Sequence, residues 1–193
     1  MKQLVHIHGG EAWDTDSEYI SFLKRWEVAT PFQDSIKGWK HNYEIKLGDE
    51  WQIIRPQMPS ALNSKYNEWA VWFEKYIPYL LDGVVLVGHS LGANFLVKYI
   101  TENDMPVKIS QVHLVAGCYG WGGGFGLSKL VSDMDNKYEK IYIYHSKDDT
   151  SVPFSDAEKY KEALPSAQLI TFTDRGHFLQ PKFPELMNNI LKV

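Results

Sequence analysis

The chain has 193 residues, a net charge of −4 at pH 7, 44% hydrophobic residues and 23% charged residues. This length fits a single domain, residues 1–193, with room for a substantial core. The absence of a basic stretch argues against nucleic-acid binding, and the absence of an apolar run of about 18 residues argues against a membrane span. One cysteine and the lack of a signal-peptide pattern favour a cytoplasmic protein.

The sequence alternates between short apolar runs and amphipathic stretches. The runs are rich in Val, Ile and Tyr and are typical of buried strands, whereas the amphipathic stretches have helical spacing. In chain order the predicted elements are strand Gln3–His8, helix Tyr19–Trp26, strand Trp51–Arg55, helix Trp69–Leu81, strand Val84–Gly88, helix Leu91–Glu102, strand Gln111–Ala116, strand Lys140–His145, helix Ser155–Leu164, strand Gln168–Phe172 and helix Lys182–Leu191.

The alternation predicts an α/β fold with about six mostly parallel strands and helices on both faces. Two segments interrupt it. Val28–Glu50 is long and polar, and only a loop or a small excursion is predicted there. Ala116–Leu127 is rich in glycine, which predicts a mobile loop that leads into a short helix. The sequence Ser155-Asp156-Ala157-Glu158 has the capping-box pattern at the start of its helix.

The segment between the third strand and its helix reads Gly88-His89-Ser90-Leu91-Gly92. Gly-x-Ser-x-Gly in this position is the pattern of a nucleophile elbow, in which a tight, strained turn exposes the serine hydroxyl. The two glycines leave room for the turn, and the N–H of Leu91 is a candidate donor to an oxyanion. A purely structural serine in a tight turn is the alternative interpretation.

Two later strands end in polar turns that can supply an acid and a base. Asp148-Asp149 follows the fifth strand, and Gly176-His177-Phe178 follows the sixth. The carboxyl ends of parallel strands meet at one edge of the sheet, where open α/β sheets build their sites. The order serine, aspartate, histidine is the one that this architecture requires. The sequence therefore predicts that Ser90, an acidic residue of this turn and His177 act together.

These motifs resemble the α/β-hydrolase superfamily and are similar to its compact serine hydrolases, which include retinoblastoma-binding protein nine. The resemblance rests on the elbow, on the acidic turn followed by Val152-Pro153, and on the Gly-His-Phe turn; it covers nearly the whole chain outside Val28–Glu50. It implies a single α/β-hydrolase domain with a minimal lid. It also selects Asp149 as the acid, because family members place the acid four residues before this proline. Asp148 stays a rival and Asp174 a weaker one.

The resemblance implies further parts of the site. In the loop His8-Gly9-Gly10-Glu11-Ala12-Trp13, the family pattern assigns the second oxyanion N–H to Gly10. Relatives insert a cap after the fourth strand, so nearby aromatic side chains are candidates for the wall of an acyl pocket, with simple packing as the alternative. These candidate pocket residues are Trp13, Tyr119, Trp121 and Phe125, and it stays open whether Gly117–Gly126 acts as a lid.

No metal or cofactor is expected. His6 and His8 alternate on one strand face, but a third ligand at a recognisable spacing is lacking. Cys118 is expected near the cleft without a catalytic role. The other histidines that lie in or beside strands are expected to be structural; they are His89, His113 and His145.

Together these features predict a serine hydrolase that acts on a small-molecule acyl substrate through an acyl-serine, and the resemblance implies a carboxylesterase-like enzyme. Peptidase, amidase and acyltransferase activities use the same kind of site and stay open. The alternative from another class is a non-catalytic pseudo-hydrolase or protein-binding module on the same fold. The sequence itself indicates no protein partner.

Overall fold

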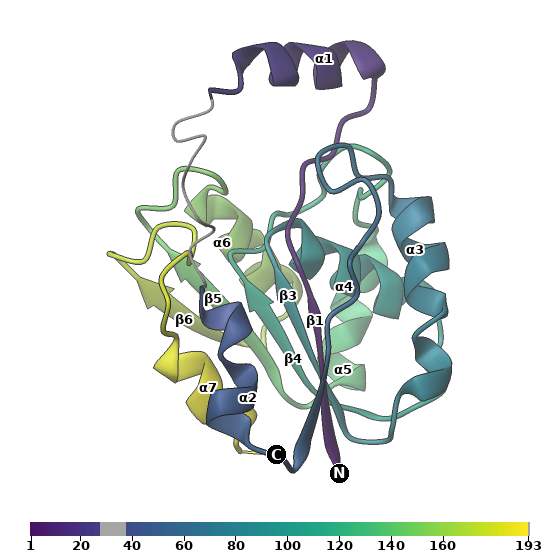
Figure 1. Ribbon diagram of the computed structural model, residues 1–193, viewed down its shortest axis with the longest axis vertical. Helices are drawn as coiled ribbons and strands as arrows, with labels where there is room; N and C mark the ends of the chain where they lie inside the picture. Colours follow the sequence, from purple (N-terminus) through teal and green to yellow (C-terminus); the bar gives the residue numbers. More distant parts are fainter. Residues whose placement is uncertain (28–37, 193) are drawn as a thin grey trace.

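The computed structural model describes residues 1–27 and 38–192, and its strands form one sheet in the order β2-β1-β3-β4-β5-β6 (Figure 1). All neighbouring strands are parallel, and each predicted strand is present with ends shifted by one or two residues at most. The strands are β1 (Lys2–Ile7), β2 (Trp51–Ile54), β3 (Val84–His89), β4 (Ile109–Val115), β5 (Ile141–Ser146) and β6 (Gln168–Phe172).

Helices cover both faces of the sheet, as an α/β fold requires (Figure 1). In chain order the helical segments are α1 (Asp16–Arg25), the 3₁₀ turn η1 (Trp39–His41), α2 (Tyr43–Leu47), α3 (Tyr66–Glu74), the 3₁₀ turn η2 (Ile77–Tyr79), α4 (Leu91–Glu102), the 3₁₀ turn η3 (Lys129–Asp133), α5 (Met134–Lys137), α6 (Phe154–Ala163) and α7 (Pro184–Ile190). This architecture confirms the predicted fold class.

The strand side chains divide between two cores according to their alternation along the strand. On β3, Val84 and Leu86 belong to the core beneath α3, α4 and α6, whereas Val85 and Val87 belong to the core beneath η1, α2 and α7. All six β3 residues are buried, because both faces of the sheet are covered. The continuous apolar run of this strand follows from that double burial.

Two helix predictions need correction. The predicted helix Trp69–Leu81 is α3 followed by the separate 3₁₀ turn η2. Pro78 lies in that turn, and a proline ring cannot continue an α-helix because it lacks an N–H and clashes with the preceding turn. The capping box predicted at Ser155–Glu158 is wrong. Helix α6 begins after Pro153 without a side-chain cap, and the Asp156 carboxylate instead accepts hydrogen bonds from the Tyr119 N–H and from the ammonium of Lys159.

Helix α1 lies apart from the layers that cover the sheet (Figure 1). It begins with a capping box, because the Thr15 hydroxyl accepts from the Glu18 N–H and the Glu18 carboxylate accepts from the Thr15 N–H. None of its residues is buried. Its contacts include the ring of Phe22, which packs 4.8 Å from the ring of Trp13 and 4.9 Å from that of Trp26.

The two segments that interrupted the sequence pattern differ in the structure. Of Val28–Glu50, residues 28–37 lie outside the described part, and the rest forms η1 and α2. The glycine-rich loop is held by several hydrogen bonds rather than left free: Asn94 accepts from the Gly120 N–H and donates to the Phe125 carbonyl, and Asp14 accepts from the Gly123 N–H. Within residues 1–27 and 38–192, no helix is both long and apolar enough to cross a bilayer.

Candidate active site

Ser90 lies in the turn between β3 and α4 and has φ 56° and ψ −123°. A non-glycine residue in such a conformation costs of order 1–3 kcal/mol, and strain of this kind concentrates at functional sites. The Ser90 N–H donates to the Val115 carbonyl at 2.8 Å, which fixes the turn to β4. The side chain does not cap α4. The turn therefore holds the hydroxyl at the helix N-terminus without using it as a cap.

Three glycines make room for this turn. A Cβ on Gly88 would lie 2.5 Å from the Ala93 Cα, and a Cβ on Gly92 would lie 2.5 Å from the His8 carbonyl oxygen. A Cβ on Gly9 would lie 2.9 Å from the Ser90 Cβ. The glycine at position 9 thus lets the loop after β1 come into direct contact with the serine.

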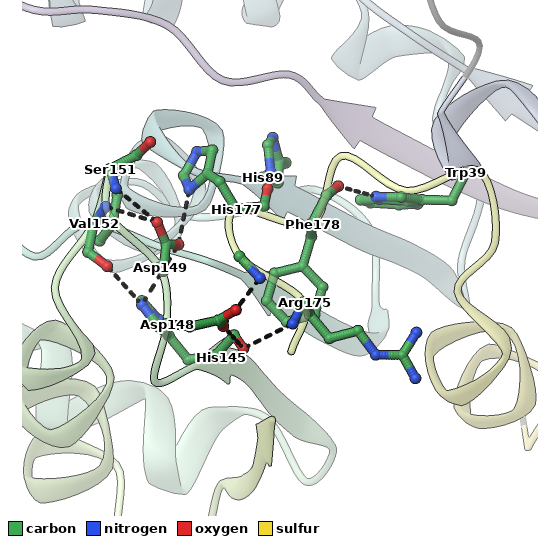
Figure 2. A network of polar contacts seen from close by, with 12 residues as sticks. Trp39, His89, His145, Asp148, Asp149, Ser151, Val152, Arg175, His177 and Phe178 are labelled. Atoms are coloured by element: carbon green, nitrogen blue, oxygen red, sulfur yellow. Dashed lines mark hydrogen bonds and ion pairs between the residues drawn. The ribbon is translucent and has the colours of Figure 1, made fainter. Parts of the chain in front are cut away.

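The candidate acid and the candidate base meet at the same edge of the sheet (Figure 2). The Nδ1 of His177 lies 2.8 Å from the Oδ2 of Asp149, whose Oδ1 accepts from the N–H groups of Ser151 at 2.8 Å and Val152 at 3.1 Å. Burial alone would raise the pKa of Asp149, but the hydrogen bonds from His177 and the two N–H groups outweigh it and lower the pKa. An ionised carboxylate only accepts, so Nδ1 carries the proton and Nε2 keeps its lone pair.

The rival acids lie elsewhere. Asp148 accepts from the Ser146 hydroxyl and from the Gly176 N–H, and these bonds hold the turn that carries His177 rather than its ring (Figure 2). The Asp174 side chain is 80% exposed and lies beside Arg175. Of the three candidate carboxylates, only Asp149 contacts His177.

His89 and Trp39 hold the turn that carries His177 (Figure 2). The sequence did not reveal this role for either residue. The His89 Nε2 donates to the His177 carbonyl at 2.9 Å, and the two imidazole rings lie 4.8 Å apart. The Trp39 indole N–H donates at 2.7 Å to the carbonyl of Phe178, which has a left-handed φ of 55°. The only sequence signal for His89 is its place inside the elbow motif, and Trp39 lies in the segment without an assignment.

The tautomer of His89 follows from these contacts. A carbonyl oxygen only accepts, so Nε2 carries the proton and Nδ1 is the acceptor, 3.5 Å from the ammonium of Lys40. Burial lowers the pKa of His89 well below its usual value, and the charge of Lys40 acts in the same direction. His89 is therefore a neutral imidazole between the base and a lysine.

The two candidate oxyanion donors are the N–H groups of Leu91 and Gly10. Leu91 is the first residue of α4, so its N–H has no acceptor within the helix. Neither this N–H nor that of Gly10 donates to any residue in the described ranges. Glu11, which the sequence did not single out, is half-buried beside them. Burial raises the pKa of its carboxyl group, and the neighbouring His177 acts in the opposite direction.

The four candidate pocket residues are not equivalent. Trp13, Tyr119 and Trp121 are partly exposed. Phe125 is fully buried, with its ring 5.4 Å from that of Trp69 and its contacts in the main core. The assignment of Phe125 to a pocket wall is therefore corrected to core packing, because the hydrogen bonds to Asn94 draw this part of the loop onto α4.

His113, His145 and Cys118 are buried side chains. His113 lies between the Gln111 amide and the Tyr144 hydroxyl, and His145 bonds the Val152 carbonyl at 3.0 Å. Cys118 is buried, and burial raises the pKa of its thiol well above the usual value, which disfavours the reactive thiolate. No cluster of three potential metal ligands occurs among the residues whose positions are described.

Comparison with known proteins places the chain. The family model for serine hydrolases matches residues 32–182. This chain belongs to the serine hydrolase family. The ydeN gene product of Bacillus subtilis is 23% identical over 190 residues, which span 93% of this chain and 87% of that protein. Its crystal structure has a TM-score of 0.77 and 20% identity, and the match covers 100% of this chain and 98% of the other.

A second relative and a structural neighbour are also similar to this chain. The serine hydrolase RBBP9 of Rattus norvegicus is 24% identical over 142 residues, which span 71% of the chain described here and 75% of RBBP9. An esterase from Exiguobacterium antarcticum has a TM-score of 0.60 and 14% identity, over 100% of this chain and 91% of the other. The family and the fold both support hydrolase activity, and they confirm the resemblance inferred from the sequence motifs.

Proposed function

We propose that this serine hydrolase cleaves a carboxylic ester, or a related acyl bond, through an acyl-serine formed on Ser90. His177 acts as the general base and Asp149 orients it. The observation that supports this most strongly is the 2.8 Å contact between His177 Nδ1 and Asp149, which leaves Nε2 free to accept a proton. Ser90 lies in its strained turn at the carboxyl end of β3, the same edge of the sheet from which the turn of His177 extends. The Ser90 hydroxyl and His177 are not hydrogen-bonded to each other in the structure, and catalytic hydrogen bonds of this kind commonly tighten only in the complex with substrate.

Acylation follows from these positions. The Ser90 Oγ attacks the carbonyl carbon while Nε2 of His177 takes the hydroxyl proton, and Asp149 stabilises the imidazolium that forms. The N–H groups of Leu91 and Gly10 donate to the oxyanion. When the tetrahedral intermediate collapses, the bond to the leaving group breaks, and that group takes the proton from His177.

Deacylation repeats the sequence with water. His177 removes a proton from a water molecule, whose oxygen attacks the acyl carbon, and the bond to Ser90 then breaks as Oγ takes the proton back. The carboxylic acid is released and the serine is regenerated. No metal or cofactor takes part in either half of this proposed reaction.

An ester is the preferred substrate class. An alkoxide is a better leaving group than an amide anion, so an ester depends less than an amide does on the proton that His177 returns. The esterase among the structural neighbours supports this choice by fold alone. Amides, thioesters and transfer to another acceptor use the same groups and form the alternative arms of the test.

The test combines labelling with turnover. Wild-type protein is expected to react with a fluorophosphonate probe and to hydrolyse p-nitrophenyl butyrate, whereas Ser90→Ala loses the label and His177→Ala loses turnover by about 10³-fold or more. Ser132→Ala, which changes an exposed serine, is the matched control and keeps both activities. An unlabelled wild type would instead favour a binding module on the same fold, and equal labelling of Ser90→Ala would remove Ser90 as the nucleophile.

A further inference from the structure

A pocket of about 330 Å³ lies between β1, the segment after β2 and η1. Ser90, Asp149 and His177 are not among the residues that line it. No acidic side chain is among its described lining residues, whereas five basic or imidazole side chains line it. They are His6, His8, Lys40, His41 and Arg55.

Lys40 and Arg55, the lysine and the arginine of this pocket, differ in whether a carboxylate pairs with them. The Arg55 guanidinium forms two hydrogen bonds, of 2.5 and 2.8 Å, with the carboxylate of Glu44, and a third to the Lys40 carbonyl at 3.1 Å. Lys40 forms no ion pair within the described ranges; its ammonium approaches only the Nδ1 of His89, at 3.5 Å. Burial lowers the pKa of Lys40. The ammonium is thus partly removed from water without a carboxylate to replace it, which is costly unless an anion is supplied.

Two imidazoles of the pocket, those of His6 and His8, are neutral and line it with uncharged polar groups. His8 is neutral, because its Nδ1 donates to the Gly9 carbonyl at 2.6 Å and its Nε2 accepts from the Met58 N–H at 2.9 Å. His6 is only 3% exposed, and burial, followed by the charge of Lys40, lowers its pKa well below the usual value.

One polar atom of this wall lacks a partner. The Nδ1 of His6 lies 3.0 Å from the Tyr43 hydroxyl, but the buried Nε2 bonds no residue in the described part of the chain. When the phenol donates to Nδ1, Nε2 carries the proton and can donate to a bound anion. Among the described residues, this pocket therefore combines a buried donor that has no acceptor with an ammonium that has no counter-ion, and a single bound anion would satisfy both.

The pocket also touches the active site at two points. His8 directly precedes Gly9, whose backbone contacts Ser90. Lys40 contacts His89, which bonds the carbonyl of His177. One intervening residue thus links the pocket lining to Ser90, and another links it to His177.

We infer that this pocket binds an anionic group, a carboxylate or a phosphate, that the acyl substrate carries a few bonds from its scissile carbonyl. The inference rests on the proposed function, since it names the substrate class of that site. Lys40 supplies the charge, and His6 supplies a neutral donor. Arg55, already paired with Glu44, holds the backbone of Lys40.

The kinetic test compares a matched pair of substrates, p-nitrophenyl hydrogen glutarate and its methyl ester. Wild type is expected to prefer the anionic ester, and Lys40→Met is expected to lower the ratio of the two kcat/KM values about tenfold or more, because a charge-assisted hydrogen bond is lost. Lys40→Arg keeps most of the ratio. Lys46→Met removes a charge from an exposed lysine of α2 and serves as the control with an unchanged ratio. An equal ratio in wild type and Lys40→Met would overturn the inference.

A binding test separates this inference from the proposed chemistry. Ser90→Ala protein is titrated with glutarate, inorganic phosphate or neutral glutaramide, and the ring resonances of His6 and His8 are followed by NMR. Saturable shifts with either anion and none with glutaramide are expected, and the anion that binds more tightly identifies a carboxylate or a phosphate ligand. Absence of shifts with both anions would refute the anion pocket even if ester hydrolysis is intact. Binding without any hydrolysis by wild type would refute the proposed function alone.

Discussion

The acid of the proposed triad gives the sharpest test, because two adjacent aspartates have different surroundings. The Asp149 side chain is fully buried and accepts hydrogen bonds from His177 and from two backbone N–H groups. In Asp149→Asn the remaining oxygen can still accept from the N–H groups of Ser151 and Val152. The new amide NH₂ then faces the imidazole.

This replacement reverses the proton on the base. An NH₂ group can only donate, so Nδ1 of His177 must accept and its proton moves to Nε2. The nitrogen that should take the proton of Ser90 is then already protonated. Loss of the correct tautomer is expected to lower kcat by about 10⁴-fold, which corresponds to about 5 kcal/mol of transition-state stabilisation.

The assay is steady-state hydrolysis of p-nitrophenyl butyrate, with thermal unfolding to verify that each variant is folded. The matched control is Asp148→Asn. Asp148 bonds the Gly176 N–H and the Ser146 hydroxyl, so this change disturbs the turn without touching the ring and is expected to cost less than about tenfold in kcat. A folded Asp149→Asn protein within tenfold of wild type would refute the assignment, as would an equal loss in both variants.

Three further expectations concern stability. Gly88→Ala places a Cβ 2.5 Å from the Ala93 Cα and should lower the free energy of unfolding by about 1–3 kcal/mol in urea titrations, whereas Gly126→Ala, where nothing lies within 4 Å, should change it far less. Tyr144→Phe removes a buried hydroxyl that bonds an imidazole and an amide, and a loss of about 1–3 kcal/mol is expected; a loss below about 0.5 kcal/mol would contradict that network. The pKa of Asp149 is lower in the folded state than its unfolded value of about 3.9. The stabilising contribution of its carboxylate to the free energy of unfolding is therefore present above about pH 4 and declines as pH falls through the folded pKa. The difference in unfolding free energy between wild type and Asp149→Asn should shrink accordingly below pH 4, and a constant difference would show that the carboxylate is not stabilised.

The sequence by itself determined the layers of this protein and the strand–turn–helix unit that carries Ser90. Strands such as Val84–His89 are buried on both faces, so their apolar runs are visible without any knowledge of their neighbours. The Gly-x-Ser-x-Gly turn is recognisable from its local pattern, because Gly88 makes room for the backbone of the following helix, whereas the room that Gly92 leaves is for the backbone of Ile7 and His8. The order of the serine, acidic and histidine turns then followed from the chain alone.

Tertiary structure decided the identity of each contact. The choice between Asp148 and Asp149 depends on which carboxylate meets His177, across 28 residues of sequence. Phe125 lies in the core. The pocket around Lys40 is lined by residues at the ends of two strands and by residues of a segment whose structure the sequence pattern did not predict. Periodicity records only whether a position is buried. Which partner a buried or polar group meets depends on how distant segments pack, and this packing holds Lys40 beside His89.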